Sequence, residues 1–293
     1  MQRSEQVAER LAQASFWTAG LVSLSVVIAL FGFIGWVGWP TFRDQGIEFM
    51  IGHEWSVADE CFRALPIFVG SAIVTFTALV LALPLGMSAA FVTAEAAPEK
   101  IRPFLKFLME ILAGIPSVIY GLVGIAVLIP FLQTRMDLLT GRTLLTAGIV
   151  LAVMILPTLA TLAEDAIKAV PREKREAGWA LGLTRIETIR HCVFPEAKAG
   201  IVAAVLLAAG RAVGETIAVM LLVGSLDRMP SPWYDWFVPG QTLTSKIARE
   251  AAESAVGSPQ YHALAALALV LLIGVSIVSL GASHVTTQGR ESR

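Results

Sequence analysis

The chain of 293 residues is strongly apolar and almost neutral: 56% of its residues are hydrophobic, 15% are charged, and its net charge is −1. Soluble globular proteins average about 45–50% apolar and about 25% charged residues, so this composition indicates an integral membrane protein. The near-zero net charge argues against nucleic acid as a partner, because nucleic-acid binding requires a strongly basic surface.

Six apolar stretches are each long enough to cross a bilayer, which takes about 20 residues of helix. They are residues 16–39, 67–93, 111–132, 144–163, 199–225 and 263–283. The sequence therefore predicts an all-α, polytopic membrane protein with six transmembrane helices. We expect Pro40 to end the first helix, and the glycines and proline of residues 114–121 to break the third helix or to pack it closely.

The placement of lysine and arginine predicts the orientation, because these residues are enriched in cytoplasmic loops. Residues 1–15, 94–110, 164–198 and 284–293 carry fourteen of them, and the three other loops carry seven. We therefore expect a multi-pass protein with both termini in the cytoplasm.

Three parts follow from this topology. Residues 1–66 hold the N-terminal cytoplasmic segment, the first helix and an outer loop. Residues 67–283 form the main transmembrane domain with a cytoplasmic loop at 164–198, and residues 284–293 are a cytoplasmic tail. The second long outer loop, residues 226–262, is expected to end in a short surface helix. Two cysteines, Cys61 and Cys192, fall on opposite sides of the membrane and so are not expected to pair.

The cytoplasmic loop of residues 164–198 has its own predicted architecture. Pro171 suits the first position of a helix, and Gly182 suits a left-handed helix end. Thr184, with Glu187 three residues later, matches the capping box that starts a second helix. The prediction is helix, glycine turn, helix.

This loop also offers an apolar face formed by Trp179, Leu183 and Ile186. A simple connector does not need such a face, so we interpret the loop as a docking element for a cytoplasmic partner. The alternative is an amphipathic helix that lies on the membrane surface.

The fifth apolar stretch contains two ionisable residues, Arg211 and Glu215. On one continuous helix their side chains would lie one turn apart on the same face. Arg211 would lie roughly 18 Å along a helix that begins at Ala199, near the middle of the bilayer. Charged groups at that depth usually face a protein interior or a water-filled path, and the planar fork of arginine suits a substrate with negative oxygens. The alternative is an internal ion pair that only locks helices together.

Common enzyme signatures are absent from the sequence, which has no GxxxxGK[ST] phosphate loop, no HExxH and no GxSxG. The four histidines are scattered singly, so neither a metal nor another cofactor is expected. We therefore expect a non-catalytic protein. If it moves a solute uphill, the energy must come from an ion gradient or from another polypeptide.

A recognisable motif lies in the loop of residues 164–198. It consists of Glu176-Ala177-Gly178, Gly182 and Phe194-Pro195. The motif resembles the EAA loop of ABC importer permeases, in which EAA, a glycine and a later LP recur at about these spacings. Gly178 replaces the third alanine of that pattern, and Phe194 replaces its leucine. The residues that the resemblance assigns to ATPase coupling are Glu176, Ala177, Gly178 and Gly182.

Three further stretches narrow the resemblance: LAGIPSVIYGLVG (residues 112–124), GRAVGETIAVMLLVGS (210–225) and FVPGQTLTSKIA (237–248). They are similar to the phosphate-specific ABC transport permeases, and the last stretch favours the PstC type. The resemblance covers nearly the whole chain. It implies a type I ABC importer permease fold in the bacterial inner (plasma) membrane, and a substrate path that includes Arg211, Glu215 and Thr216.

The same resemblance implies partners. A second permease of the PstA type would form a heterodimer with this chain within the membrane lipid. A dimeric cytoplasmic ATPase of the PstB type would hydrolyse ATP, and an extracytoplasmic binding protein of the PstS type would deliver inorganic phosphate. Two alternatives stay open: an ABC permease for another oxyanion, such as molybdate or sulfate, and a gradient-driven carrier or channel that acts alone. The second alternative predicts inverted repeats, which we do not find in the sequence.

Overall fold

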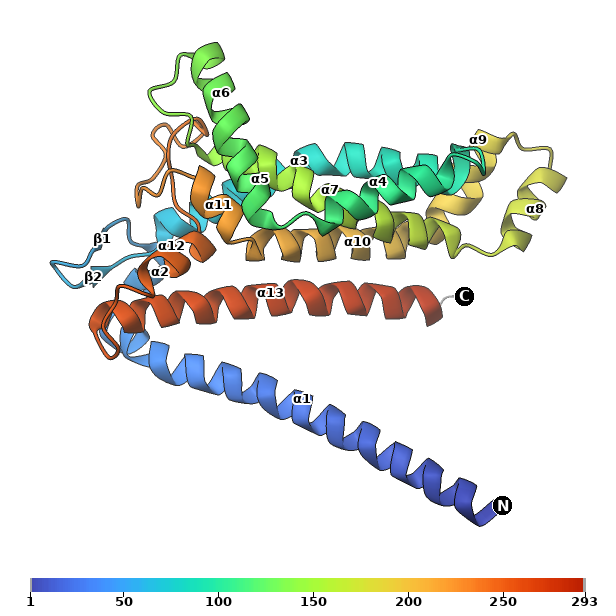
Figure 1. Ribbon diagram of the computed structural model, residues 1–293, viewed down its shortest axis with the longest axis horizontal. Helices are drawn as coiled ribbons and strands as arrows, with labels where there is room; N and C mark the ends of the chain where they lie inside the picture. The colour runs from blue at the N-terminus through green and yellow to red at the C-terminus, as the bar shows by residue number, and fades with distance from the viewer. Residues whose placement is uncertain (1, 292–293) are drawn as a thin grey trace.

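The computed structural model describes residues 2–291, with side chains described for residues 13–285 (Figure 1). Six helical segments in this part of the chain are long and apolar enough to cross a membrane. They are Gln13–Gln45, Leu65–Ala96, Ser117–Met136, Leu144–Lys168, Arg185–Gly214 and Pro259–Val285. The prediction of an all-α polytopic protein with six spans is confirmed.

The two ends of the helical bundle carry different elements (Figure 1). At one end lie α8 (Arg172–Ala180) and α9 (Arg185–Thr188), together with the N-terminal end of α1 and the C-terminal end of α13. At the other end lie α2 (Glu48–Ile51), α12 (Leu243–Glu250) and an antiparallel hairpin of β1 (Trp55–Ser56) and β2 (Cys61–Phe62). We call these the α8–α9 end and the hairpin end. The charged helix-turn-helix therefore shares a side with both ends of the described chain.

The first helix, α1 (Gln2–Gln45), is the least buried of the six spans. It continues through Pro40, so the prediction that Pro40 ends it is wrong. The proline lies within the last two turns, where the fold tolerates the one backbone hydrogen bond that a proline cannot make. At Gly38, α1 crosses α13 (Pro259–Glu291) so closely that an added Cβ would lie 2.8 Å from the Ala266 nitrogen. Towards its N-terminal end α1 diverges from α13 (Figure 1), which leaves its apolar side chains open to lipid or to another chain.

The best-buried part of the fold is the contact of α3 (Leu65–Phe91) with α7 (Leu144–Lys168), beside α10 (Phe194–Gly214). Small residues allow the close approach. A Cβ on Gly148 of α7 would lie 2.6 Å from the Thr77 Cβ of α3, and a Cβ on Gly86 would lie 2.9 Å from the Leu159 Cδ2. Within a bilayer, helices associate through such close packing, because lipid supplies no hydrophobic force between them.

The third apolar stretch is broken as expected. Helix α4 (Arg102–Gly114) ends at Gly114, and after an extended turn α5 (Ser117–Val123) begins; η2 (Gly124–Leu128) and α6 (Ile129–Met136) complete the span. Gly121 then packs closely against α11 (Ile217–Leu222), because an added Cβ would lie 2.6 Å from the Leu221 Cδ1. The break and the close packing predicted for residues 114–121 are both present.

The short helix at the end of the second long loop, α12, does not lie on the surface as predicted. Its first turn is buried from Leu243 to Lys246. Phe49, Phe62 and Leu267 form a buried apolar cluster with Leu243 at the hairpin end. The sequence pattern is misleading here because the polar residues of α12 find partners inside the fold.

Candidate functional site

The residues predicted to line a substrate path lie where the fifth apolar stretch breaks. Helix α10 ends at Gly214, Glu215 has an extended backbone (φ −68°, ψ 129°), and α11 begins at Ile217. The expectation of one helix through residues 199–225 is therefore wrong. The Glu215 carbonyl accepts a hydrogen bond of 2.7 Å from the Thr244 Oγ1 of α12, so a tertiary contact replaces the helical bond at this point.

Arg211 lies in the last turn of α10, and its side chain bonds to α7. Its Nη1 donates a hydrogen bond of 2.7 Å to the Thr158 Oγ1 of α7. Among the described side chains no ion pair joins Arg211 to Glu215, and the expectation that the two side chains lie one turn apart on one helix face is wrong. The cause is the break, because a residue beyond the helix end no longer lies on the helix face that its spacing predicts. Tyr120 of α5 is close enough to Arg211 for an electrostatic interaction.

The guanidinium thus lies among α5, α7 and α10, and it is exposed on the surface of the single chain. Leu207 and Ile217, on either side along the chain, are also exposed. A lone arginine on an apolar membrane surface is costly. We therefore expect this surface to face another protein chain or a water-filled path, and not lipid.

Glu215 and Thr216 flank the break itself. The Glu215 side chain is partly exposed and borders a small void between α3, α10 and α12. The Thr216 Oγ1 donates to the Gly214 carbonyl at 3.1 Å. The break therefore places a cation, a carboxylate and a hydroxyl close together in the chain, with the cation and the carboxylate not paired to each other.

The second candidate site is the helix-turn-helix of α8 and α9, which is present as predicted. The turn at Gly182 has φ +79°. The Gly182 N–H bonds to the Trp179 carbonyl (2.9 Å) and the Leu183 N–H bonds to the Gly178 carbonyl (3.2 Å), the pair of bonds that defines a Schellman motif. The capping box of Thr184 and Glu187 follows. Only the extent differs, because α9 continues through η3 (Ile189–Val193) into α10 without a break.

The four predicted coupling residues fall on α8 and its turn. Glu176 is exposed and pairs with Arg172 at 2.9 Å, and Ala177 is exposed beside it. Gly178 faces inward, where an added Cβ would lie 3.0 Å from the Thr188 Cγ2 of α9. The small residue at this position therefore sets how closely α8 approaches α9.

The predicted apolar face of this element is partly present. Trp179 is 51% exposed and Ile186 is 77% exposed, whereas Leu183 is half-buried. Trp179 lies on α8, outside the spanning segments, and Ile186 lies in the first turn of the Arg185–Gly214 segment, so the element presents an apolar surface at the α8–α9 end.

The element is fixed to the bundle by contacts that the sequence analysis missed. Arg175 of α8 donates to the Glu95 Oε1 at 2.8 Å and to the Ile167 carbonyl at 2.9 Å. Arg185 of α9 donates to the Glu95 carbonyl. Glu95 belongs to η1 (Val92–Ala96), which extends α3. Both α8 and α9 are therefore bonded to η1, the turn that ends the second span.

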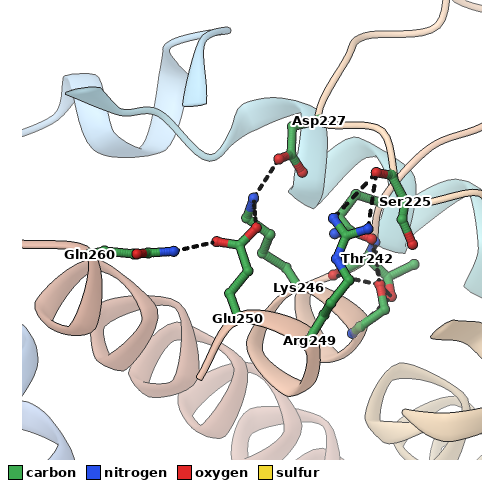
Figure 2. A network of polar contacts seen from close by, with 9 residues as sticks. Ser225, Asp227, Thr242, Lys246, Arg249, Glu250 and Gln260 are labelled. Carbon is green, nitrogen blue, oxygen red and sulfur yellow. Dashed lines mark hydrogen bonds and ion pairs between the residues drawn. The ribbon is translucent and has the colours of Figure 1, made fainter. Parts of the chain in front are cut away.

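A buried ionic network occupies the hairpin end (Figure 2). Lys246 is fully buried and pairs with Asp227 and Glu250, and its ammonium lies 4.6 Å from the centre of the Trp55 ring. Glu250 also accepts from the Gln260 side chain at 3.0 Å. The network joins the second long loop, the hairpin, α12 and α13. Its sequence signal was the spacing of Lys246 and Glu250, four residues apart on a helix.

These observations define an all-α, multi-pass membrane protein with a charged helix-turn-helix at one end and an arginine at a helix break. The family described as "Binding-protein-dependent transport system inner membrane component" matches residues 82–285, and the chain belongs to this family. Membership implies a non-catalytic membrane component that works, in general terms, with a second permease, an ATPase and a binding protein.

Several curated proteins are similar over most of their length. The "Probable ABC transporter permease protein YqgH" of Bacillus subtilis (strain 168) is 34% identical over 258 residues, which cover 86% of this chain and 82% of that protein. The "Phosphate transport system permease protein PstC" of Mesorhizobium japonicum is 35% identical, covering 80% and 76%. PstC 2 of Mycobacterium tuberculosis is 35% identical, covering 86% and 83%.

Two solved structures share the fold. Inward-facing MetNI, a methionine ABC transporter, aligns with a TM-score of 0.57 and 18% identity, covering 75% of this chain and 93% of that one. An amino acid ABC transporter aligns with a TM-score of 0.52 and 16% identity, covering 74% and 92%. The fold is that of the type I ABC importer permeases.

Proposed function

We propose that this chain is a permease subunit of an ATP-driven importer of inorganic phosphate. The names of the relatives from Mesorhizobium japonicum and Mycobacterium tuberculosis support the substrate. The observation that carries the proposal is the state of Arg211, which is exposed at a helix break and held on one side by Thr158. In the described part of the chain it has no carboxylate partner.

A guanidinium presents five N–H donors in a planar fork that matches oxyanions bidentately. Thr158 uses one donor of Arg211, so the remaining donors are available to a phosphate. Arg211 offsets the charge of the anion at the point where the anion leaves water. This loss of hydration is the costly step of the passage.

Glu215 and Thr216 have supporting roles in this proposal. The Glu215 carboxylate lies near the path and repels the anion, which keeps Arg211 from holding it too tightly. The Thr216 hydroxyl supplies a neutral hydrogen-bonding group at the break.

A second permease of the PstA type covers the surface that carries Arg211. The exposed residues around it, Leu207 and Ile217, give an apolar contact. The heterodimer would then enclose Arg211 in a path between two chains, away from lipid. An extracytoplasmic binding protein of the PstS type delivers phosphate at the hairpin end.

The α8–α9 element docks on a dimeric ATPase of the PstB type in the cytoplasm. Glu176 and Ala177 are exposed on α8, with the apolar side chains of Trp179 and Ile186 nearby. Gly178 and Gly182 set the geometry between the two helices. The clustering of lysine and arginine at this end supports its cytoplasmic orientation.

Two other functions remain as competitors. A permease for sulfate or molybdate would use the same arginine, since one guanidinium does not by itself distinguish tetrahedral anions. A gradient-driven carrier would need no ATPase and would give no reason for the α8–α9 element.

The test is uptake of labelled phosphate at low external concentration in cells that lack their own high-affinity system. The chain is supplied alone, or together with candidate permease, ATPase and binding-protein partners. We expect uptake only with the partners, dependent on ATP and resistant to excess sulfate and molybdate. Uptake by the chain alone would establish a self-sufficient carrier, and strong competition by sulfate or molybdate would reassign the substrate.

A further inference from the structure

An apolar groove of about 710 Å³ lies at the α8–α9 end of the molecule. One wall is formed by the last turns of α3 and the start of η1, including Met87 and Phe91. The other wall is formed by the continuous helix of α9, η3 and α10, including Ile186 and Phe194. The groove has the size of a small-molecule site, and it is separate from Arg211.

Among the described residues, Arg190 is the single charged one that lines this groove. Its side chain is exposed, and within the described part of the chain it takes part in no hydrogen bond or ion pair. This distinguishes it from Arg175 and Arg185, which are both bonded to Glu95. Arg190 therefore has its donors free beside an apolar surface.

The position of the groove indicates what occupies it. Its α3 wall belongs to a span that runs from Leu65 to Ala96, so the groove opens near the end of a membrane-crossing helix. At that depth the hydrocarbon of one leaflet meets its headgroups. A ligand that fits must be apolar over most of its length and anionic at the end near Arg190.

We propose that the groove binds an anionic phospholipid of the cytoplasmic leaflet. An acyl chain lies between α3 and α10, and the headgroup phosphate accepts hydrogen bonds from Arg190. Basic pockets between spanning helices on the cytoplasmic side attract anionic headgroups, and the guanidinium fork suits a phosphate. The inference uses the cytoplasmic orientation of this end and is independent of the transported substrate.

The test is native mass spectrometry of the full-length chain with equal amounts of phosphatidylglycerol and phosphatidylcholine that carry identical acyl chains. The wild type is expected to prefer phosphatidylglycerol by about fivefold, the effect of one arginine near a membrane surface. Arg190→Gln is expected to abolish this preference. The matched control is Lys198→Gln, which removes an exposed charge from the same continuous helix outside the groove. This variant should retain the preference for phosphatidylglycerol.

A second variant tests the apolar part of the site without changing any charge. Ser88 is exposed and lines the groove, so Ser88→Trp fills it and is expected to lower the binding of both lipids. Equal binding of the two lipids by the wild type would overturn the proposal, as would an unchanged preference in Arg190→Gln. If Arg190→Gln left the lipid preference intact and instead lost the ATPase or the second permease on purification, the occupant would be protein. Failure of phosphate uptake would bear on the transport proposal alone, because lipid binding is measured without transport.

Discussion

Arg211 of α10 and Thr158 of α7 are joined by a hydrogen bond of 2.7 Å between Nη1 and Oγ1. The bond fixes the guanidinium one turn before α10 ends, and it does so without a carboxylate. Orientation by a neutral hydroxyl leaves Arg211 without a carboxylate partner in the described part of the chain, as its proposed role in phosphate passage requires.

Thr158→Val is expected to lower phosphate uptake about tenfold at limiting phosphate, because a hydrogen bond to a charged group contributes about 1.5–3 kcal/mol. Thr158→Ser keeps the hydroxyl and should retain most of the activity. Thr161→Val is the control, since in the described part of the chain the Thr161 hydroxyl bonds only to the Pro157 carbonyl of its own helix (2.8 Å). Equal uptake by the Thr158→Val and Thr161→Val variants would show that this bond does not orient the arginine.

Gly182→Val is expected to weaken the coupling of ATP hydrolysis to substrate. Gly182 has φ +79° and open space around it, so the cost comes from backbone strain, about 1–2 kcal/mol for a residue with a side chain. Gly182→Asn is the matched control, because asparagine tolerates the left-handed conformation. The measurement is ATPase activity of the assembled complex with and without loaded binding protein. Normal substrate dependence in Gly182→Val would argue against a coupling role.

Lys246→Ala is expected to destabilise the chain by about 3–5 kcal/mol, the usual cost of breaking a buried ion pair. The substitution leaves the carboxylates of Asp227 and Glu250 without their shared cation. Lys100→Ala, at an exposed position, is the control. Thermal unfolding in detergent measures both variants, and equal midpoints would mean that the network adds nothing to stability.

Gly70→Ala is expected to destabilise the chain by about 1–3 kcal/mol, as is usual for overpacking. An added Cβ at Gly70 of α3 would lie 2.0 Å from the Gln241 carbonyl oxygen, so the loop before α12 must move. Gly274→Ala in α13 meets no atom within 4 Å and should be neutral or slightly stabilising. The two substitutions add the same methyl group, so a similar unfolding midpoint for both would contradict the close approach of α3 and this loop.

Much of the fold was predictable because its signals are local. A spanning helix is recognised from its length and hydropathy. The turn at Gly182 and the cap at Thr184 are determined by the residues next to them in the sequence. The single break between α4 and α5, at Gly114 and Pro116, likewise has a local cause. Each of these features depends on backbone geometry that a few consecutive residues determine.

Apart from the predicted helix end at Pro40, the errors concern contacts between distant residues. The end of α10 before Glu215 depends on a bond from Thr244, and the burial of α12 depends on Asp227 and Trp55 as partners for Lys246. Thr158 had no signal of its own, because a single threonine in an apolar span usually bonds to its own helix. Spacing alone therefore identified Arg211 as a candidate but wrongly placed Glu215 on the same helix face.

The most direct test of the central claim is phosphate uptake by Arg211→Ala and Arg211→Lys in the complete complex, with assembly checked by co-purification of all partners. We predict that Arg211→Ala assembles normally but loses uptake by at least about 30-fold, since removing a desolvated charge contact costs about 2 kcal/mol or more. Arg211→Lys should recover part of the uptake, because it restores the charge without the fork. Wild-type uptake by an assembled Arg211→Ala complex would contradict the role of Arg211 in phosphate passage.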